Sequence, residues 1–423
     1  MPNSPIAKYT GWVAIGIAVL FVVLGFYGYA NYAKFHARVE ALKKAGEPIS
    51  VSDFTVKVAP EDDLLTPLTE FKDEIIEFGS QCPREWFARE ELSDKEVELF
   101  ESLVEKHPNV FAAIDEACER SEMSFDPLLK QEFKAVDLVK VLVLLGWKAG
   151  VRRFEGQHEE AAKIALQMLS LSGELDAATL LTSSLSRAFQ NVAINLVSEM
   201  VADEAKSGKA ISKELKDEIA NQLRGFETLQ DFQTVVKAER ARMIHMLINP
   251  ELYEPEDGYE HSHIASVIFK VKGGGAATWG NAILDQFETM SKLSEAPLSA
   301  ELDSEIVPQP NMLLRAIGMD VGFAWTSIRD NYGESVIRQR ALVILLALTQ
   351  DGKASDRTDW STDYLVGIGV PEEMTVDPYN DKPLIIRRIE GMWRIYSVGP
   401  NRVDDSGTVS VDYGLGLLVE EED

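Results

Sequence analysis

A histidine followed by two glutamates is the first pattern in this sequence that could do chemistry. His158-Glu159-Glu160 begins like the His-Glu-x-x-His helix of zinc proteases, where two histidines four positions apart bind the metal and the glutamate acts as general base. Ala162 stands where the second histidine is needed, so the zinc ligand set is incomplete. The pattern therefore indicates the exposed start of a helix.

A second group of candidate metal ligands lies in a polar segment. His261 and His263 stand two positions apart, with Glu256, Asp257 and Glu260 close by in the chain. Imidazole and carboxylate groups bind zinc, so one interpretation is a metal cluster on a loop. The other is a solvated loop, which the pattern favours because no further ligands follow at the spacing of a zinc site.

The two cysteines, Cys82 and Cys118, are compatible with a disulfide outside the cytoplasm or with two inert thiols inside it. A bridge would close a loop of about 37 residues and stabilise the fold by roughly 3–4 kcal/mol. Cys118 is a poor candidate nucleophile, because Arg120 is its only basic neighbour and the adjacent Glu116 and Glu119 oppose any lowering of its pKa.

Other catalytic and nucleotide-binding motifs are missing from the sequence. It contains no nucleophile elbow and no Walker loop, and Gly367-Ile368-Gly369 lacks the third glycine and the preceding strand of a dinucleotide-binding turn. Glu239-Arg240 and Arg329-Asp330 have the form of ion pairs on helix surfaces. We therefore predict no catalytic residues and no organic cofactor, and favour a non-enzymatic protein.

Composition narrows the class of partner. The 423 residues include 69 acidic and 42 basic side chains, which give a net charge of −27. This charge keeps a protein soluble and disfavours nucleic acid as a partner, whereas it permits a cationic one. At about 100–200 residues per domain, the chain is long enough for two or three domains.

A long apolar run, Gly11–Ala30, lies near the start of the chain. At about 1.5 Å per residue it can cross a hydrocarbon core of about 30 Å. Aromatic residues, which favour membrane interfaces, stand at both ends: Tyr9 and Trp12 at one, and Phe26, Tyr27, Tyr29 and Tyr32 at the other. A cleaved signal peptide is the alternative, but the run exceeds the roughly 7–15 apolar residues of such peptides. We therefore predict a single-pass anchor that contacts membrane lipid.

The flanks of the run bear on its orientation. Only Lys8 precedes it, whereas Lys34, Arg38, Lys43 and Lys44 follow it. Taken literally, this bias places the body of the protein in the cytoplasm, although large domains can be translocated despite it.

Apolar residues at intervals of three and four predict helices through most of the remaining chain. The expected segments are Asn31–Lys44, Leu64–Ile75, Val97–Val104, Phe111–Cys118, Pro127–Phe154, Glu159–Leu171, Leu181–Val192, Ile211–Leu223, Leu229–Leu247, Ile283–Met290, Asn311–Ile328 and Glu334–Gln350. Ser93 to Glu96 has the form of a capping box, and His107-Pro108 ends the helix that follows. One helix pair resembles a tetratricopeptide unit, but no 34-residue period is evident.

The predicted fold is therefore mainly α, a helix bundle or irregular helical array behind a transmembrane helix. A small β-hairpin, Leu384–Ile389 with Met392–Val398, follows near the C-terminus and should pack on the preceding long helix. The expected organisation is an anchor (1–33), a stalk and connector (34–60), a helical domain (61–250), a mixed connector (251–310), and long helices with a β tail (311–423).

The tail is the most distinctive part of the sequence. Asp377-Pro-Tyr-Asn-Asp-Lys-Pro-Leu384 is followed by Trp393-Arg-Ile-Tyr-Ser-Val-Gly-Pro-Asn401 and then by Asp404-Asp405. It resembles the C-terminal motif of the type II secretion major pseudopilin, in which an Asp-Pro-aromatic turn, a hairpin and a Tyr-Ser-Leu-Gly phrase precede an acidic loop. The wider layout is similar to that of uncharacterised bacterial single-pass membrane proteins, which carry no assigned activity.

The resemblance implies a calcium site in the acidic loop. The carboxylates that correspond are Asp404, Asp405 and Asp412, whereas calcium takes about six to eight oxygen ligands. The alternative is a turn in which the Asp side chains accept hydrogen bonds from local backbone. The pseudopilin leader is absent, because Trp12 follows Gly11 and the run contains no Glu, so the run is better interpreted as a permanent anchor. The resemblance also favours an extracytoplasmic body.

Three hypotheses about function follow. The first is a membrane-anchored, non-enzymatic helical interaction or scaffold protein with a protein partner. The second is a calcium-stabilised, secretion-related component. The third is an extracytoplasmic hydrolase whose site is assembled from distant residues, with His261 and His263 as candidates.

Overall fold

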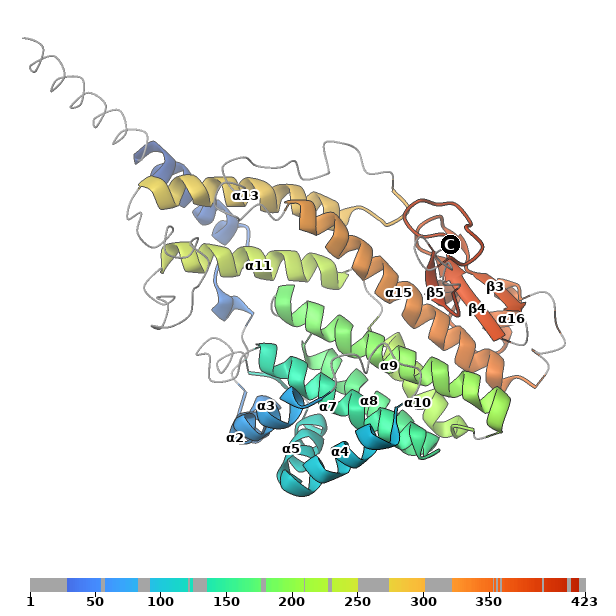
Figure 1. Cartoon of the computed structure of the whole chain (residues 1–423). Coiled ribbons are helices and arrows are strands. Elements are labelled where there is room, and N and C mark those ends of the chain that lie inside the picture. The colour runs from blue at the N-terminus through green and yellow to red at the C-terminus, as the bar shows by residue number, and fades with distance from the viewer. Residues whose placement is uncertain are drawn as a thin grey trace, which may run out of the picture. The chain divides into compact units, whose positions relative to one another are not determined.

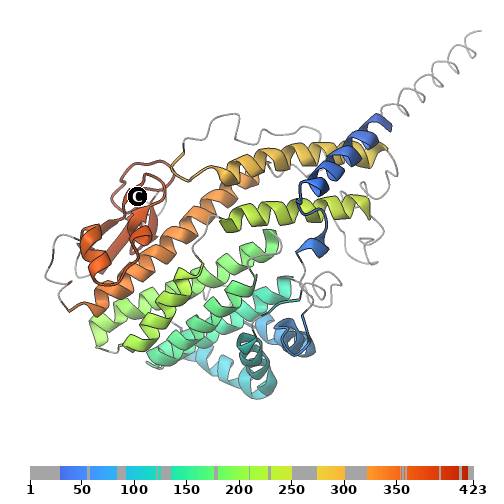
Figure 2. The ribbon, with the colours of Figure 1, turned by 180° about the vertical axis from the view of Figure 1, so that it is seen from behind.

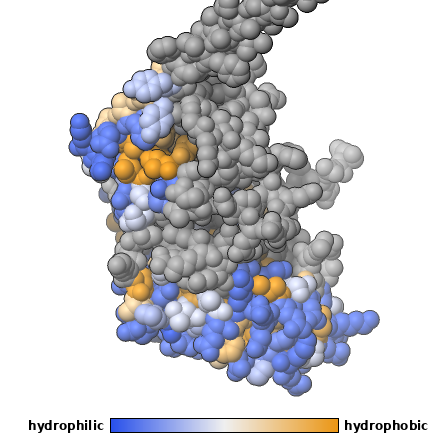
Figure 3. Space-filling view, turned by 90° about the vertical axis from the view of Figure 1, so that its left-hand side faces the viewer, coloured by the Kyte–Doolittle hydropathy of each residue, from blue (hydrophilic) through white to orange (hydrophobic). Residues whose placement is uncertain are grey.

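The computed structural model describes residues 29–54, 58–82, 92–120, 122–124, 135–175, 180–208, 210–226, 230–249, 274–300, 322–352, 354, 357, 360–389, 392–408 and 412–417. Helices dominate these residues, and short antiparallel strands follow near the C-terminus (Figure 1), as the periodicity predicts. Of the predicted anchor, only Tyr29 and Ala30 are among them. No helix of the described residues has the length and apolar character needed to cross a membrane. In the view of Figure 3, hydrophilic side chains predominate, with hydrophobic patches between them.

The chain divides into two compact units, each of which is discontinuous in sequence. The first unit comprises Met1–Phe54, Val236–Leu293 and Leu302–Thr326. Its described part contains a helix at residues 29–44, the second part of α11 (Gln230–Ile248), and α13 (Gly274–Glu295), with the 3₁₀ turn η1 (Val51–Asp53) after the first helix. Its core is formed by Phe35, Val39, Ile244 and Leu284, with Leu42, Ile49 and Leu247 packed against them.

The predicted stalk is part of this core. Phe35 and Val39 are each only 4% exposed. Gly280 of α13 lets the Phe35 ring approach its backbone, since a Cβ at this position would stand 2.6 Å from two of the ring carbons. Arg38 extends the contact, donating to the Asn281 carbonyl at 3.1 Å and to Asp285 at 2.6 Å. The segment is therefore a packed helix, not a free stem.

The second unit comprises Thr55–Val235, Ser294–Glu301 and Ser327–Asp423. Its helices are α2 (Leu65–Glu70), α3 (Lys72–Ser80), α4 (Asp94–Lys106), α5 (Pro108–Glu119), α7 (Ala135–Phe154), α8 (His158–Leu175), α9 (Leu180–Ser207), α10 (Lys213–Arg224), most of α15 (Gly322–Gln350) and α16 (Thr362–Gly367). The front and back views agree that α7, α8 and α9 lie side by side (Figures 1 and 2), and α10 packs on α8. This arrangement is the helical array that the sequence predicts.

An aromatic cluster organises the core where α3, α4, α5 and α7 meet. Trp147 is fully buried, and its ring contacts Phe100 at 5.2 Å and Phe78 at 6.2 Å between centroids. Phe111 completes the cluster, 5.6 Å from both Phe78 and Phe100. Edge-to-face and tilted pairs of this kind add about 0.5–1.5 kcal/mol each to the burial of the rings.

Local signals explain several helix ends. The predicted capping box is confirmed at α4, where the Ser93 backbone N–H donates to Glu96 at 2.8 Å. Pro108 begins α5 at a first-turn position, where its missing N–H costs no hydrogen bond. His158 begins α8 as predicted, but it is 8% exposed, so the expectation of an exposed helix start is wrong. The segment Pro127–Phe154 is described from Ala135, as α7.

The long helix before the tail also differs from expectation. The sequence predicts two helices, at Asn311–Ile328 and Glu334–Gln350, whereas α15 runs unbroken from Gly322 to Gln350. Gly333 lies inside it without interrupting the helix.

The β tail contains two small sheets. The predicted hairpin is confirmed as β3 (Ile385–Ile389) and β4 (Met392–Ser397), antiparallel with Ile386 opposite Ile395. A third strand, β5 (Tyr413–Leu415), pairs with β4, and β1 (Val376–Asp377) pairs with β2 (Lys382–Pro383). The tail packs on α15 as expected: Arg340 donates to the Val376 carbonyl.

Candidate functional site

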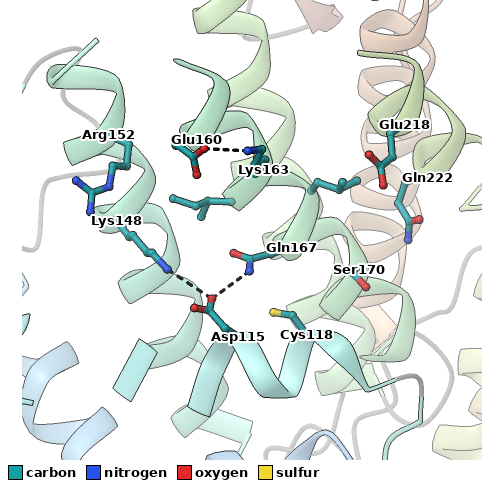
Figure 4. A pocket seen from close by; sticks show the side chains of 12 residues that line it. Asp115, Cys118, Lys148, Arg152, Glu160, Lys163, Gln167, Ser170, Glu218 and Gln222 are labelled. Carbon is teal, nitrogen blue, oxygen red and sulfur yellow. Dashed lines mark hydrogen bonds and ion pairs between the residues drawn. The ribbon is translucent and has the colours of Figure 1, made fainter. Parts of the chain in front are cut away.

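A polar groove lies among four helices of the second unit (Figure 4). Its volume is about 580 Å³. Its lining comes from α5, α7, α8 and α10: Asp115, Cys118, Lys148, Arg152, Glu160, Lys163, Ile164, Leu166, Gln167, Ser170, Glu218 and Gln222.

Helical spacing brings these side chains together. Lys148 and Arg152 are four apart on α7, and Glu218 and Gln222 are four apart on α10, so each pair lies on one face of its helix. In Figure 4 the α7 pair stands on one side of the groove and the α10 pair on the other, with Gln167 of α8 between them. The groove is therefore a product of helix packing and not of a local motif.

Asp115 is the best-held polar group of the groove. One of its carboxylate oxygens accepts a hydrogen bond from the Gln167 amide at 3.0 Å and lies 3.4 Å from the Lys148 ammonium nitrogen. The same ammonium stands 4.7 Å from the centroid of the Phe111 ring, a cation–π contact. These contacts fix both charges against the α5 end of the groove.

The remaining cations also have acidic partners. Lys163 donates to Glu160 at 2.8 Å, and Arg152 donates to Glu155 at 2.7 Å. By contrast, the side chains of Ser170, Glu218 and Gln222 make no hydrogen bond or ion pair within the described part of the chain.

The groove lacks an activated nucleophile. Burial, together with the nearby Asp115 carboxylate, raises the pKa of the Cys118 thiol to about 12 against the opposing effect of Lys148. A thiol with so high a pKa is almost fully protonated at neutral pH, and the thiolate is the reactive form. The described residues also hold no group of three or more His, Cys, Asp or Glu side chains that could bind a metal. The groove is therefore equipped to bind by ion pairs and hydrogen bonds.

The two cysteines are both thiols, so the disulfide alternative is not what the structure holds. Burial raises the pKa of Cys82 to about 12 as well.

The calcium site expected from the resemblance is not formed by the described residues. Asp404 is instead engaged by protein donors: Arg387 donates to one of its oxygens at 2.7 Å, and the Tyr396 hydroxyl and the Ser406 backbone N–H donate to the other at 3.0 and 2.9 Å. A carboxylate whose two oxygens both accept from the protein has little capacity left for a cation.

The other two carboxylates predicted to bind calcium, Asp405 and Asp412, also accept hydrogen bonds from groups of the same tail. Asp405 accepts from the Asn401 amide at 2.7 Å. Asp412 is fully buried and accepts from the backbone N–H groups of Gly407 and Thr408 at 2.7 and 3.1 Å, and its burial raises its pKa. The structure thus supports the alternative interpretation, in which Asp side chains hold the turn.

A serine–histidine pair in the first unit was not evident from the sequence, because 195 positions separate its members. The Ser50 hydroxyl oxygen lies 2.9 Å from Nδ1 of His245. The backbone N–H groups of Ile49 and Ser50, which could have stabilised an oxyanion, donate instead to Asp53 at 2.9 and 3.0 Å. This pair therefore joins η1 to α11. The histidines at 261 and 263 lie outside the described residues.

Comparisons with protein-family models, with curated proteins and with solved structures found no match. Reasoning from sequence missed the groove because each of its charged residues is ordinary for a helix surface. The only signal was their spacing of three or four, which also marks any solvated helix face.

Proposed function

We propose that this chain is a membrane-anchored, non-enzymatic helical protein that docks a protein partner in the groove among α5, α7, α8 and α10. The observation that carries the proposal is the groove itself. Its volume of about 580 Å³ falls within the range of about 300–1,000 Å³ typical of binding sites. Its polar side chains converge from four helices, and its only thiol is held in the unreactive form.

Exposure of the charged residues supports docking of a macromolecule. Glu160 and Lys163 are 56% and 55% exposed, whereas Lys148 is 19% exposed. Partly exposed charges around a more deeply set centre are the usual layout of a protein interface, in which the rim is polar. The Ile164 and Leu166 side chains add apolar surface to the lining.

The proposed anchor is supported by the tyrosines at its C-terminal end. Tyr29 and Tyr32 are 72% and 49% exposed at the start of the helix at residues 29–44. Exposed tyrosines at the end of an apolar run are typical of a membrane interface, where the ring is buried among lipid and the hydroxyl meets water.

Site-directed photocrosslinking tests the docking site. With a photoreactive benzoylphenylalanine in place of Gln167 in the full chain, we expect irradiation of native membranes to give one dominant crosslinked protein. The same group at Ser102, exposed on α4 outside the groove, should not capture it. Gln222→Trp should fill the groove and reduce the product, whereas Asn221→Trp, at the exposed neighbouring position, should not. Equal capture from both sites, or equal effects of both tryptophans, would contradict docking in the groove.

Membrane extraction and protease protection test the anchor. We expect the full chain to stay with membranes after an alkaline carbonate wash and a variant lacking Gly11–Ala30 to be released, because about 20 apolar residues suffice to hold a span. Protease added to intact bacterial spheroplasts should digest the body if it is extracytoplasmic. Release of the full chain by carbonate would refute the anchor, and a protected body would reverse the orientation.

A further inference from the structure

The charges on the two sides of the groove are neutralised to different extents (Figure 4). The three cations that line it each have a carboxylate partner: Lys148 has Asp115, Lys163 has Glu160, and Arg152 has Glu155. An incoming acidic group would have to compete with these internal pairs. The cationic side of the groove is therefore a poor receptor for an anion.

The α10 side presents acceptors that the described residues do not use. Glu218 is exposed on α10, and its carboxylate makes no ion pair with any described residue. Gln222, one turn further along, and Ser170 of α8 add an amide oxygen and a hydroxyl, which likewise have no hydrogen-bond partner in the described chain. A carboxylate with neutral acceptors beside it is complementary to a group that carries several N–H donors.

The pKa of the thiol between these groups is affected by charges of both signs. Cys118 lies between Asp115 and Ser170 in Figure 4. After burial, the effects that raise its pKa come from the carboxylates of Asp115 and Glu119, opposed by the ammonium of Lys148.

We infer that the partner inserts a basic side chain, arginine or lysine, into the part of the groove formed by Ser170, Glu218 and Gln222, beside Cys118. The inference rests on the proposed function and gives the chemistry of the partner. The net charge of −27 would attract such a partner from a distance, and the groove would fix where its cation binds. A guanidinium group, with five N–H donors, can engage the carboxylate, the amide oxygen and the hydroxyl together.

Protection of Cys118 from alkylation tests the inference. In the full chain carrying Cys82→Ser, Cys118 is the only thiol. Because its pKa of about 12 leaves little thiolate at neutral pH, its slow reaction with iodoacetamide is followed by mass spectrometry over hours at about pH 8.5. We expect acetylated, amidated hexa-arginine or hexa-lysine peptide to slow the reaction, and hexa-glutamine or hexa-glutamate peptide to leave it nearly unchanged. Each rate is compared with that of the same variant without peptide, which removes any effect of a substitution on the thiol itself.

A matched pair of charge reversals separates the site from the general field. Glu218→Lys should raise the hexa-arginine concentration for half-maximal protection by about ten-fold, because an ion pair is lost and a repulsion is added. Glu214→Lys makes the same change of charge on α10 outside the lining of the groove and should have an effect of less than about two-fold. Equal effects of the two reversals, equal protection by hexa-glutamate, or no protection by hexa-arginine would each overturn the inference.

The photocrosslinking and alkylation experiments can refute the two proposals independently. If Gln167 captures a partner but basic peptides do not protect Cys118, docking stands and the chemistry inferred for the partner is wrong. If basic peptides protect Cys118 but no partner is captured in membranes, the groove prefers cations and the proposed function fails.

Discussion

Replacing Asp377 with alanine should lower the free energy of unfolding of the second unit by about 3–5 kcal/mol. The side chain is 1% exposed, and its carboxylate accepts three hydrogen bonds: from the Ser397 hydroxyl at 2.7 Å, and from the backbone N–H groups of Tyr379 and Val398 at 2.9 and 3.1 Å. Removing the carboxylate leaves these donors buried without an acceptor, which costs more than the bonds themselves contribute. The Asp-Pro-aromatic turn is held to β4 by this one group.

Urea denaturation followed by tryptophan fluorescence measures the effect, because the ring of Trp393 in β4 is in edge-to-face contact with that of Trp360, with 5.3 Å between the centroids. Asp377→Asn should fall between wild type and alanine, since its amide oxygen can still accept. Asp405→Ala, which removes a carboxylate with one amide donor from the same tail, should cost less than about 1 kcal/mol. Similar losses for Asp377→Ala and Asp405→Ala would show that Asp377 does not hold the tail.

Gly333→Ala should destabilise the second unit by about 1–3 kcal/mol, although alanine is normally the better helix former by about 1 kcal/mol. A Cβ at this position of α15 would overlap the Tyr379 hydroxyl oxygen and would stand 2.9 Å from the ring carbon that bears it. The ring cannot easily withdraw, because Tyr379 is 2% exposed. Thermal or urea unfolding of the single variant gives the cost directly.

Tyr379→Phe provides the matching test. The Tyr379 hydroxyl is buried and has no hydrogen-bond partner among the described residues, so removing it should be neutral or should stabilise the unit by up to about 1 kcal/mol. It also removes the atom that the new Cβ of Gly333→Ala would meet first. The double variant should therefore recover most of the lost stability, with a coupling of about 1 kcal/mol or more. If the two effects simply add, the overlap does not cause the loss.

The helices were predictable where a local rule decides them. The Ser93–Glu96 capping box and Pro108 are complete within a few residues, and the structure places α4 and α5 as they indicate. The sequence predicts separate helices that end at Ile328 and begin at Glu334, and Gly333 falls in the gap between them. In α15 it instead permits close approach of Tyr379, which the local sequence does not contain.

The strands also differ in how far the local sequence predicts them. β3 and β4 adjoin in sequence and carry the β-branched and aromatic residues that predict a hairpin. β5 has three residues, one of them Gly414, and its pairing with β4 depends on a contact across the intervening loop. So short a strand has no periodic signal of its own.

The contacts of Asp404 and the polar groove could not be predicted from the sequence for one shared reason. The calcium prediction considered the acidic loop alone. In the structure, Arg387 of β3 and Tyr396 of β4 donate hydrogen bonds to Asp404. The groove was missed because Asp115 and Glu218 lie on helices about a hundred residues apart in sequence and share a site only once α8 has packed between them. Tertiary contacts decide both outcomes.

The close packing of Phe35 on Gly280 sets how the first unit could move relative to a bilayer. A flexible tether as long as the predicted stalk, 34–60, would let the body wander over about 30 Å. With Phe35 and Val39 in the core and Arg38 paired to Asp285, the helix at residues 29–44 gives no such freedom. If Gly11–Ala30 spans the membrane as proposed, the packed core of this unit begins within a few residues of the span, with no long tether between them. So short a connection would limit the orientations in which the first unit can meet a partner in the membrane. Fewer orientations lower the entropic cost of association.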